Sequence, residues 1–593
     1  MSDHSDSSRR CGCGRRRGCF TRWTRLGWAG FILGTALNAQ TPPTVDPAVQ
    51  ITDQLQREQL ERQREELRRQ RESAAPPAVI DVPVPTVDRP SVSNEFKRDI
   101  RVLEIEGAEH MREKFRERLE RDYTGRIGAS DVEALLTEIT RHYVLRGFAT
   151  TRAYLPEQDL STGRLRIVVV EGRIERITGV RFPDQIFPTG EGDMLQLRKL
   201  EQGIDNLNRL PSNQAALDLQ PGTEAGETIV AVQNTPGRRW RLNGSYDNTG
   251  SRDTGRDQAS LTLSTDDLLG LTDSFSVSHR RAVPYHSGEQ ASQSTTASLS
   301  APWGWQRVTL GGSTSSYAST FNAPSGTPLL FDGSSNSVFL RVDRMLYRDQ
   351  TSQLQAAATL TWRSSKSYLL GNLIGVSSRD MTNLEATLDY STVVWGGAFS
   401  AGAGLGIGLP IFGGLEDPAG NPDYAPHAEY VKGIFNVSYS HGFTLFGRRF
   451  QATSSLNGQY SPEVLYGSDQ LTAGGLYSVR GFDKTSPAGD SGYVWRNDVS
   501  VPLAFRNPLG PWLGSTLGVR PYVGVDQGRV WSSVDGLPPA FVPAEGALAG
   551  AVGGVAFSTS RGSVDLSYQR AFDRPPGVAS EGGRFVLRVA LSY

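Results

Sequence analysis

The last segment of the chain constrains the fold more than any other feature of the sequence. Its residues alternate between an apolar face and a polar or charged face: Phe585, Leu587, Val589, Leu591 and Tyr593 against Arg584, Arg588 and Ser592. A period of two residues predicts a β-strand. An unbroken apolar face opposite a charged face is typical of a barrel strand with lipid outside and a wet lumen inside.

The same alternation begins at about Trp240, where helical periodicity disappears, and it continues to the C-terminus. Roughly 355 residues remain for this region, and about 14–18 membrane strands with their turns and loops fit into that length. We therefore predict a transmembrane β-barrel over 237–593, with Tyr593 in the interfacial aromatic belt. A soluble β-sandwich or a pair of propellers is the alternative reading of the same alternation.

The N-terminal residues 1–39 resemble an export signal. Seven arginines precede an apolar stretch from Leu26 to Leu37, and the small residue Ala39 stands before an expected cleavage site. The apolar stretch is shorter than the roughly 20 residues that a membrane-spanning helix needs, which argues against an anchor. All three cysteines lie in this segment, so the mature chain would be free of thiols.

Residues 40–72 contain a charged helix, predicted over 47–72. Glu58 precedes Arg62 by four residues, and Glu65 precedes Arg69 by four, which is the favourable order on a helix face. A helix that is polar nearly all round has no wide face to bury, so it belongs in water, in a coiled coil or in a wet cavity. A proline-rich linker follows over 73–96 and should be extended and stiff.

Two α+β units are predicted before the barrel, over 97–173 and 174–236. The first shows the order strand, helix, helix, strand, strand, and Ser130 with Glu133 suggests a capping box for its second helix. The second unit shows a strand, a helix that stops near Pro211, and two more strands.

Nothing in the sequence suggests an enzyme. It contains no Gly-x-Ser-x-Gly elbow and no phosphate-binding loop, and its seven histidines are scattered without ligand spacing. The net charge of −1 gives no sign of a nucleic-acid partner. We therefore expect no catalytic site, no metal, no cofactor and no bound nucleotide.

Five motifs in this order resemble the outer-membrane transporters of two-partner secretion, the haemolysin secretion/activation proteins. The residues that carry the resemblance are Arg146–Gly147–Phe148, Tyr154 to Leu160, Gly163 and Glu171–Gly172 in the first unit; Leu200–Glu201, Leu207 to Gln214 and Pro221–Gly222 in the second; Asp247–Asn248 and Gly250; Val479 to Phe482; and Asp526 and Gly528. Each motif alone is weak, and the resemblance covers nearly the whole mature chain.

The resemblance implies a mainly β fold with a sixteen-stranded barrel in the bacterial outer membrane, in contact with its lipid. It implies two polypeptide-transport-associated (POTRA) domains in the periplasm, over 97–173 and 174–236, and a helix within 40–72 that plugs the resting pore. It also implies a large secreted partner, an adhesin or haemolysin that is β-helical. The POTRA sheet edges would receive this partner as an added strand.

The resemblance further implies a site inside the barrel. The tetrad Val479, Arg480, Gly481 and Phe482 would form the tip of a surface loop that folds back into the lumen. Arg480 would pair with Asp526 of the barrel-wall motif, and Gly528 would allow close approach. A charge in a confined lumen is costly unless it is paired, and the guanidinium fork fits a carboxylate. The alternative is that Arg480 is a solvated loop residue and Asp526 an ordinary lumen carboxylate.

Three functions are compatible with these patterns. The leading hypothesis is a pore that translocates one large exoprotein to the cell surface, a form of type V secretion. A barrel-assembly insertase of the same superfamily is the second. A passive porin is the third, although it would not need POTRA domains.

Overall fold

The computed structural model describes residues 80, 85–86, 97–284, 290–322, 326–482, 487–508, 510–534, 545–576, 578 and 582–593. The expected signal (1–39), the helix within 40–72 and most of the linker (73–96) lie outside these residues. No helix in the described ranges combines the length and the apolar character that crossing a membrane requires.

The first POTRA unit packs two helices on a three-stranded sheet with the order β2-β5-β4, beside a separate β1-β3 pair. Its elements are β1 (Arg98–Ile100), β2 (Val102–Glu106), α2 (Glu113–Asp122), β3 (Gly125–Ile127), α3 (Ala129–Leu145), β4 (Arg152–Tyr154), η1 (Leu160–Thr162) and β5 (Arg164–Val170). The apolar stripe of α3 meets the inward residues of β5 in one core that includes Leu135, Ile139 and Leu165. The amphipathic pattern of the helix therefore decides which side of α3 packs on the sheet, and the alternation along β5 decides which face of the sheet is covered.

Helix α3 begins earlier than the predicted capping box placed it. The chain leaves β3 at Ile127, so the backbone N–H of Gly128 is the first donor without a strand partner. The carboxylate of Asp131 accepts this N–H at 3.0 Å. Asp131 thus takes the role that the sequence suggested for Glu133, because the preceding strand fixes where the helix starts.

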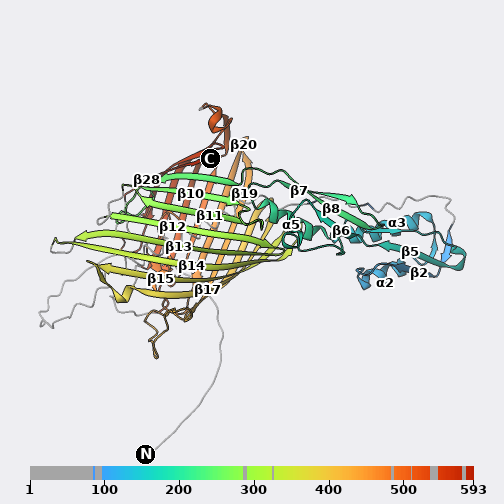
Figure 1. Cartoon of the computed structure of the whole chain (residues 1–593), viewed down its shortest axis with the longest axis horizontal. Helices are drawn as coiled ribbons and strands as arrows, with labels where there is room; N and C mark the ends of the chain where they lie inside the picture. Colours follow the sequence, from blue (N-terminus) through green and yellow to red (C-terminus); the bar gives the residue numbers. More distant parts are fainter. Residues whose placement is uncertain are drawn as a thin grey trace, which may run out of the picture. The chain divides into compact units, whose positions relative to one another are not determined.

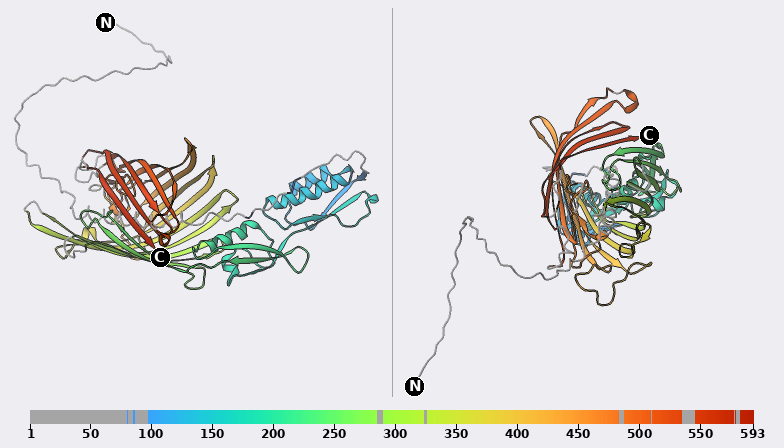
Figure 2. Two further views of the ribbon diagram at one scale, coloured as in Figure 1. Left: turned by 90° about the horizontal axis from the view of Figure 1, so that it is seen from above. Right: turned by 90° about the vertical axis from the view of Figure 1, so that its left-hand side faces the viewer.

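The second POTRA unit repeats the plan with the sheet order β6-β8-β7. Its elements are β6 (Arg173–Thr178), α4 (Pro183–Ile186), α5 (Leu197–Asn208), β7 (Ala215–Pro221) and β8 (Glu227–Asn234). Leu200, Ile204 and Leu207 of α5 are buried against the sheet. In both units the helices lie on one face of the sheet (Figure 2), which leaves the outer strands as free edges.

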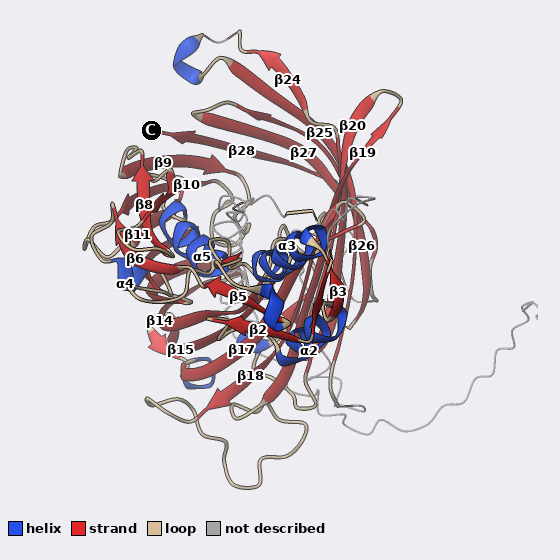
Figure 3. Cartoon of the chain, turned by 90° about the vertical axis from the view of Figure 1, so that its right-hand side faces the viewer, coloured by secondary structure: helices blue, strands red, loops and turns tan. Residues whose placement is uncertain are grey.

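The remaining strands, apart from the short β21 (Leu471–Thr472) and β22 (Ala488–Gly489), form a closed antiparallel barrel (Figures 1 and 3). They are β9 (Trp240–Asp247), β10 (Gln258–Asp266), β11 (Ser274–Ala282), β12 (Gln290–Trp303), β13 (Gln306–Asn322), β14 (Pro328–Arg348), β15 (Gln353–Leu369), β16 (Asn372–Leu373), β17 (Arg379–Val394), β18 (Gly397–Leu409), β19 (Val431–Leu445), β20 (Arg448–Tyr460), β23 (Ser491–Ser500), β24 (Leu503–Arg506), β25 (Thr516–Trp531), β26 (Gly546–Ser558), β27 (Gly562–Asp573) and β28 (Arg584–Ser592). The short β16 and β24 continue β17 and β23, so the ring has sixteen strands, which confirms the predicted fold.

The direction of the strands assigns the two ends of the barrel. The chain enters β9 directly from the second POTRA unit, and every later strand is antiparallel to its neighbour. The turns 267–273, 304–305, 349–352, 395–396 and 446–447 therefore lie at the POTRA end. The ring closes where β28 pairs with β9 over five residues, Arg588–Ser592.

Candidate functional site in the barrel lumen

Loop 6 is the name we give to residues 461–490, which connect β20 to β23. Its described part contains η3 (Gly467–Asp469) and the short pair β21 (Leu471–Thr472) and β22 (Ala488–Gly489). The loop carries the predicted tetrad, and most of its described side chains are buried. It therefore packs within the barrel end and does not extend into solvent as an ordinary surface loop would.

The tip of loop 6 is held by a cluster that we name the tip anchor: Arg480, Asp526 and Asp498. The Nε and Nη2 atoms of Arg480 each donate to a carboxylate oxygen of Asp526 at 2.6 Å, and Nη2 also reaches Asp498 at 2.7 Å. The backbone N–H of Arg480 donates to Asp526 at 3.0 Å. Asp526 is completely buried, so its carboxylate is not hydrated. The bidentate hydrogen bonds from Arg480 offset the cost of burying this charge.

The strands explain why both carboxylates point at Arg480. Asp526 lies on β25, where its neighbours Val525 and Val523 are exposed on the lipid side. Residues of a strand alternate between its two faces, so Asp526 points into the lumen. Asp498 lies on the adjacent strand β23, two residues beyond the direct partner of Asp526 in the register. Two neighbouring strands thus present two acids to one guanidinium.

Close packing fixes the rest of the tip. Gly481 has φ +102°, and a Cβ atom there would stand 2.4 Å from the backbone of Arg570 and Ala571 on β27. A Cβ at Gly528 would stand 2.8 Å from a methyl carbon of Val479. Val479 and Phe482 are buried in one apolar cluster with wall residues of β23 and β25. The structure thus brings together all six residues singled out in the sequence.

A second charged cluster holds the base of loop 6, and sequence reasoning missed it. We name it the base anchor: Asp469, Arg363, Lys432 and Tyr430. Arg363 on β15 donates to Asp469 at 3.2 Å, and the Tyr430 hydroxyl donates to the same carboxylate at 3.0 Å. The Nζ atom of Lys432 on β19 donates to the backbone carbonyl of Asp469 at 2.6 Å. All four side chains are buried.

The sequence does contain one signal for the base anchor. Asp469 is the only charged residue between Glu463 and Arg480. A lone charge in an otherwise uncharged stretch of a loop that folds inward needs a partner. The sequence could not identify that partner, because Arg363 lies 106 residues away on a different strand.

The second POTRA unit is bonded to the barrel through buried polar groups. The Arg209 side chain donates to the Ser300 hydroxyl at 2.7 Å and to the Thr272 carbonyl at 3.0 Å. The Asn206 amide donates to the Gly304 carbonyl at 2.8 Å. Arg348, at the end of β14, pairs with Asp205 of α5. Helix α5 is therefore fixed to three successive hairpin turns of the barrel.

The linker contributes an unexpected contact to this junction. The Ile80 N–H donates to Glu201 of α5 at 3.0 Å, and its side chain packs on the core of the second POTRA unit. Glu201 is completely buried and also binds Arg198 at 2.6 Å. One carboxylate thus joins the linker to the helix that contacts the barrel.

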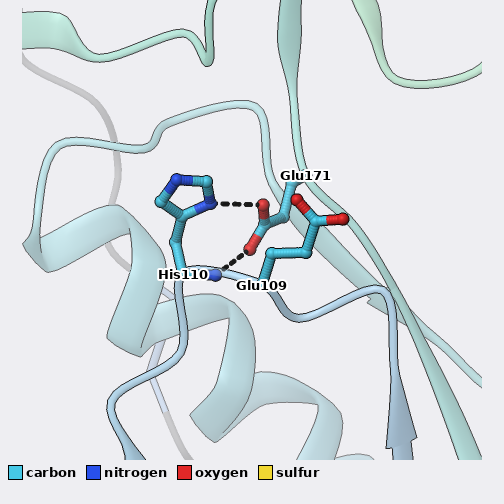
Figure 4. A group of neighbouring side chains, drawn as sticks. All are labelled: Glu109, His110 and Glu171. Carbon is cyan, nitrogen blue, oxygen red and sulfur yellow. Dashed lines mark hydrogen bonds and ion pairs between the residues drawn. The ribbon is translucent and has the colours of Figure 1, made fainter.

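Glu109, His110 and Glu171 are the one group of side chains in the described ranges with metal-ligand spacing, and their ligand atoms lie within 4.8 Å of one another (Figure 4). Glu171 is already engaged: it accepts the His110 N–H, the His110 ring at Nδ1 and the Tyr143 hydroxyl, each at 2.8 Å. Burial raises the pKa of Glu171, but these hydrogen bonds outweigh it and hold that pKa below its usual range. We interpret the group as a structural network of the first POTRA unit.

Family models match three parts of the chain. Residues 226–557 match the model of the haemolysin secretion/activation proteins ShlB/FhaC/HecB. Residues 99–172 match the ShlB-type POTRA domain, and residues 178–221 match a further POTRA domain.

The chain also resembles curated proteins and solved structures. It is 32% identical over 446 residues to the outer membrane transporter CdiB-2 of Burkholderia pseudomallei, which covers 73% of this chain and 72% of the relative. It is 30% identical to the hemolysin transporter protein ShlB of Serratia marcescens, over 68% of this chain and 70% of the relative. The structure of CdiB from Escherichia coli aligns with a TM-score of 0.80 at 26% identity, over 93% of this chain and all of that chain. The protein therefore belongs to the ShlB/FhaC/HecB family of haemolysin secretion/activation proteins.

Proposed function

We propose that this protein carries one large secreted polypeptide from the periplasm to the cell surface, as the transporter of a two-partner secretion system. The barrel lies in the outer membrane and its POTRA domains lie in the periplasm. The observation that supports transport most directly is loop 6, which occupies the lumen and is bonded by charged groups to two separate sets of wall strands, β23 and β25 at its tip and β15 and β19 at its base. A passive porin would need neither this loop nor the bonded POTRA unit.

The partner is a secreted exoprotein, and the POTRA sheets provide the recognition surface. Strands β4 and β7 lie at sheet edges, and the exposed residues Tyr154 and Leu155 stand at the end of β4. An unfolded client segment adds to such an edge through backbone hydrogen bonds, with selectivity from the alternating side chains. The second POTRA unit delivers the client directly to the barrel mouth, because buried bonds fix it there.

The secreted partner is a haemolysin or an adhesin with a β-helical fold. A polypeptide of this kind crosses the barrel unfolded and then folds outside. The folding free energy prevents backward sliding, so transport proceeds without a nucleotide. The helix expected within 40–72 plugs the resting pore, since a helix that is charged all round suits a polar lumen and is unsuited to lipid.

Transport requires that the tip of loop 6 stays bound to the barrel wall inside the lumen. Arg480 and Asp526 form the ion pair that keeps the tip on the wall. Outer-membrane lipid contacts the outward face of the barrel, where apolar residues such as Val523 and Val525 are exposed.

Deletion of this chain tests the proposal. We expect the secreted partner to accumulate in the periplasm, while unrelated outer-membrane proteins assemble at normal levels. A plasmid copy of the wild-type chain should restore secretion. Normal secretion of the partner in the deletion strain would refute the transporter role, and a general loss of outer-membrane proteins would favour an insertase.

A further inference from the structure

Helix α5 of the second POTRA unit begins against a residue of the first. The side chain of Gln196, which precedes the helix, forms no capping hydrogen bond. Instead, the N–H of Leu197, the first helical residue, donates to the Gly147 carbonyl of the first unit at 2.8 Å. The first N–H groups of a helix have no partner within the helix and need one elsewhere. The motif Arg146–Gly147–Phe148 in the first unit therefore supplies part of the cap for a helix of the second.

Each unit also contributes an apolar side chain to the core of the other. Ala149, which follows the same motif in the first unit, is buried in the core of the second unit. Met194, which precedes α5 in the second unit, packs on the core of the first. Neighbouring domains of one chain usually move relative to each other unless an apolar interface joins them. Separation of these two units would expose apolar surface on both.

The connection between the units is short and is bonded to both of them. Glu171 and Gly172 alone separate β5 from β6. Glu171 accepts two hydrogen bonds from His110 of the first unit (Figure 4). The Gly172 N–H donates to the Thr151 hydroxyl of the first unit at 3.2 Å, and its carbonyl accepts the Leu195 N–H of the second at 2.8 Å. Hinge residues must change their backbone angles, and these bonds oppose such a change.

Helix α5 also sets the distance between two free sheet edges. Near its N-terminal end, Arg152, the first residue of the edge strand β4, donates to the Ala149 carbonyl at 2.7 Å. At its C-terminal end, Asn208 exchanges side-chain hydrogen bonds of 2.6 and 2.9 Å with Ala215, the first residue of the edge strand β7. A helix of 12 residues is about 18 Å long. The two edges therefore begin roughly 18 Å apart.

We propose that the two POTRA units form one rigid arm, whose edges β4 and β7 together bind a single unfolded polypeptide. The proposal rests on the proposed function and adds a requirement on the secreted partner. The partner must contain two strand-forming segments with at least about five residues between them, since an extended chain advances about 3.4 Å per residue.

The short edge of the first unit explains why two edges are needed. Strand β4 has three residues, so a segment added there alone forms few backbone hydrogen bonds. Strand β7 has seven residues and offers a longer edge. A second edge at a fixed distance makes the second contact intramolecular, which strengthens binding without any new contact. A flexible arm would lose most of this gain, because the distance between the edges would vary.

Distances between spin labels test the rigidity of the arm first. The mature chain is expected to contain no cysteine, so Arg141→Cys on α3 and Ala225→Cys between β7 and β8 give one labelled site in each unit. Both positions are exposed. Double electron–electron resonance on the full-length protein in bilayers should show one narrow distance distribution, unchanged when the unfolded secreted partner is added. A broad distribution, or one that shifts with the partner, would overturn the proposal.

A loosened arm tests whether the two edges act together. The double variant Ala149→Glu, Met194→Glu places a charge where each unit receives the apolar side chain of the other, which favours opening of the interface. We expect a broader distance distribution and at least about tenfold weaker binding of the unfolded secreted partner to the full-length protein in nanodiscs. The control Ala149→Ser, Met194→Leu keeps the interface and should bind as wild type does.

The outcomes separate this proposal from the proposed function. A broader distance distribution with unchanged affinity would overturn the joint action of the two edges and leave transport intact. A partner that does not bind the wild-type protein at all would refute both. If the amides of α3 and α5 lose protection from hydrogen exchange in the glutamate variant, an insertion of Gly-Ser-Gly-Ser after Gly172 replaces it in the same measurements.

Discussion

The two anchors of loop 6 have opposite polarity. At the tip anchor the loop supplies the cation, Arg480, and the wall supplies the carboxylates Asp526 and Asp498. At the base anchor the loop supplies the carboxylate, Asp469, and the wall supplies the cations Arg363 and Lys432. A loop that exchanged or shifted its two contacts would bring like charges together, so opposite polarity specifies a single placement.

The anchors also differ in where they attach. The tip binds β23 and β25, which are neighbours in the ring and directly follow the loop. The base reaches back to β15 and β19. Loop 6 is therefore attached to separate sectors of the wall, and the release of one anchor leaves the other in place.

Loss of the tip cation should have the largest effect. Arg480→Ala leaves Asp526 buried without its main partner, and breaking a buried pair in this way costs about 3–5 kcal/mol. We expect secretion of the partner to fall at least about tenfold, since that cost exceeds the 1.4 kcal/mol that corresponds to a factor of ten. The barrel should still assemble, as judged by the gel shift of the folded form. Unchanged secretion would show that the pairing has no role in transport.

Neutralising the base carboxylate should have a smaller effect. Asp469→Asn removes one charge but keeps the backbone carbonyl that Lys432 binds, so we expect a cost of about 1.5–3 kcal/mol. Secretion should fall less than with Arg480→Ala, and protease should cleave loop 6 faster than in wild type. Glu463→Gln, a half-buried acid at the start of the same loop, is the matched control. The Gln amide oxygen can still accept the Val431 N–H that Glu463 accepts, so this variant should behave as wild type. If Asp469→Asn is also indistinguishable from wild type, the base anchor is dispensable.

A double variant sharpens the comparison further. Because the anchors share no partner, Arg480→Ala and Asp469→Asn should lower the stability of loop 6 additively, within about 0.5 kcal/mol. Protection of loop 6 amides from hydrogen exchange measures this stability in each variant. A strong departure from additivity would mean that the two anchors form a single cooperative unit.

The smallest expected effect is a pH dependence of the stability of the first POTRA unit, which lies outside the barrel. This unit is held together mainly by apolar packing and not by buried ion pairs such as those of loop 6. Burial, with the nearby Arg146, lowers the pKa of His142 in the first POTRA unit to about 4, and its ring stacks on Phe115. The folded unit disfavours the protonated ring, so stability is full above about pH 6.5 and declines as the pH falls toward 4. With allowance for partial exposure, we expect a loss of about 1–2 kcal/mol.

Hydrogen exchange of the α3 amides, compared between wild type and His142→Gln at neutral pH and near pH 4.5, measures this effect. The wild type should lose protection at the lower pH relative to the variant. Equal pH dependence of the two proteins would contradict the assignment to His142.

Local patterns predicted much of this molecule. The alternation in the last strand indicated a lipid-facing barrel, whereas the residues of the tip were identified through the resemblance of the tetrad and the wall motif to a known family. The base anchor could not be predicted, because Arg363 and Asp469 come together only when the strands are arranged in the ring. No pattern in the sequence near either residue indicates this contact. The Ile80 contact escaped for the same reason, since a proline-rich linker gives no sign of where it docks. The start of α3 was misplaced because β3 fixes it.

Translocation by the purified full-length protein alone in liposomes would show whether this barrel is itself the export pore. The secreted partner, unfolded, is added outside vesicles whose POTRA domains face outward, and external protease then digests whatever has not crossed. We predict that wild-type vesicles protect the partner, that Arg480→Ala vesicles protect little of it, and that detergent abolishes protection. A partner that stays fully digestible with the wild-type protein would mean that the barrel alone does not form the export pore.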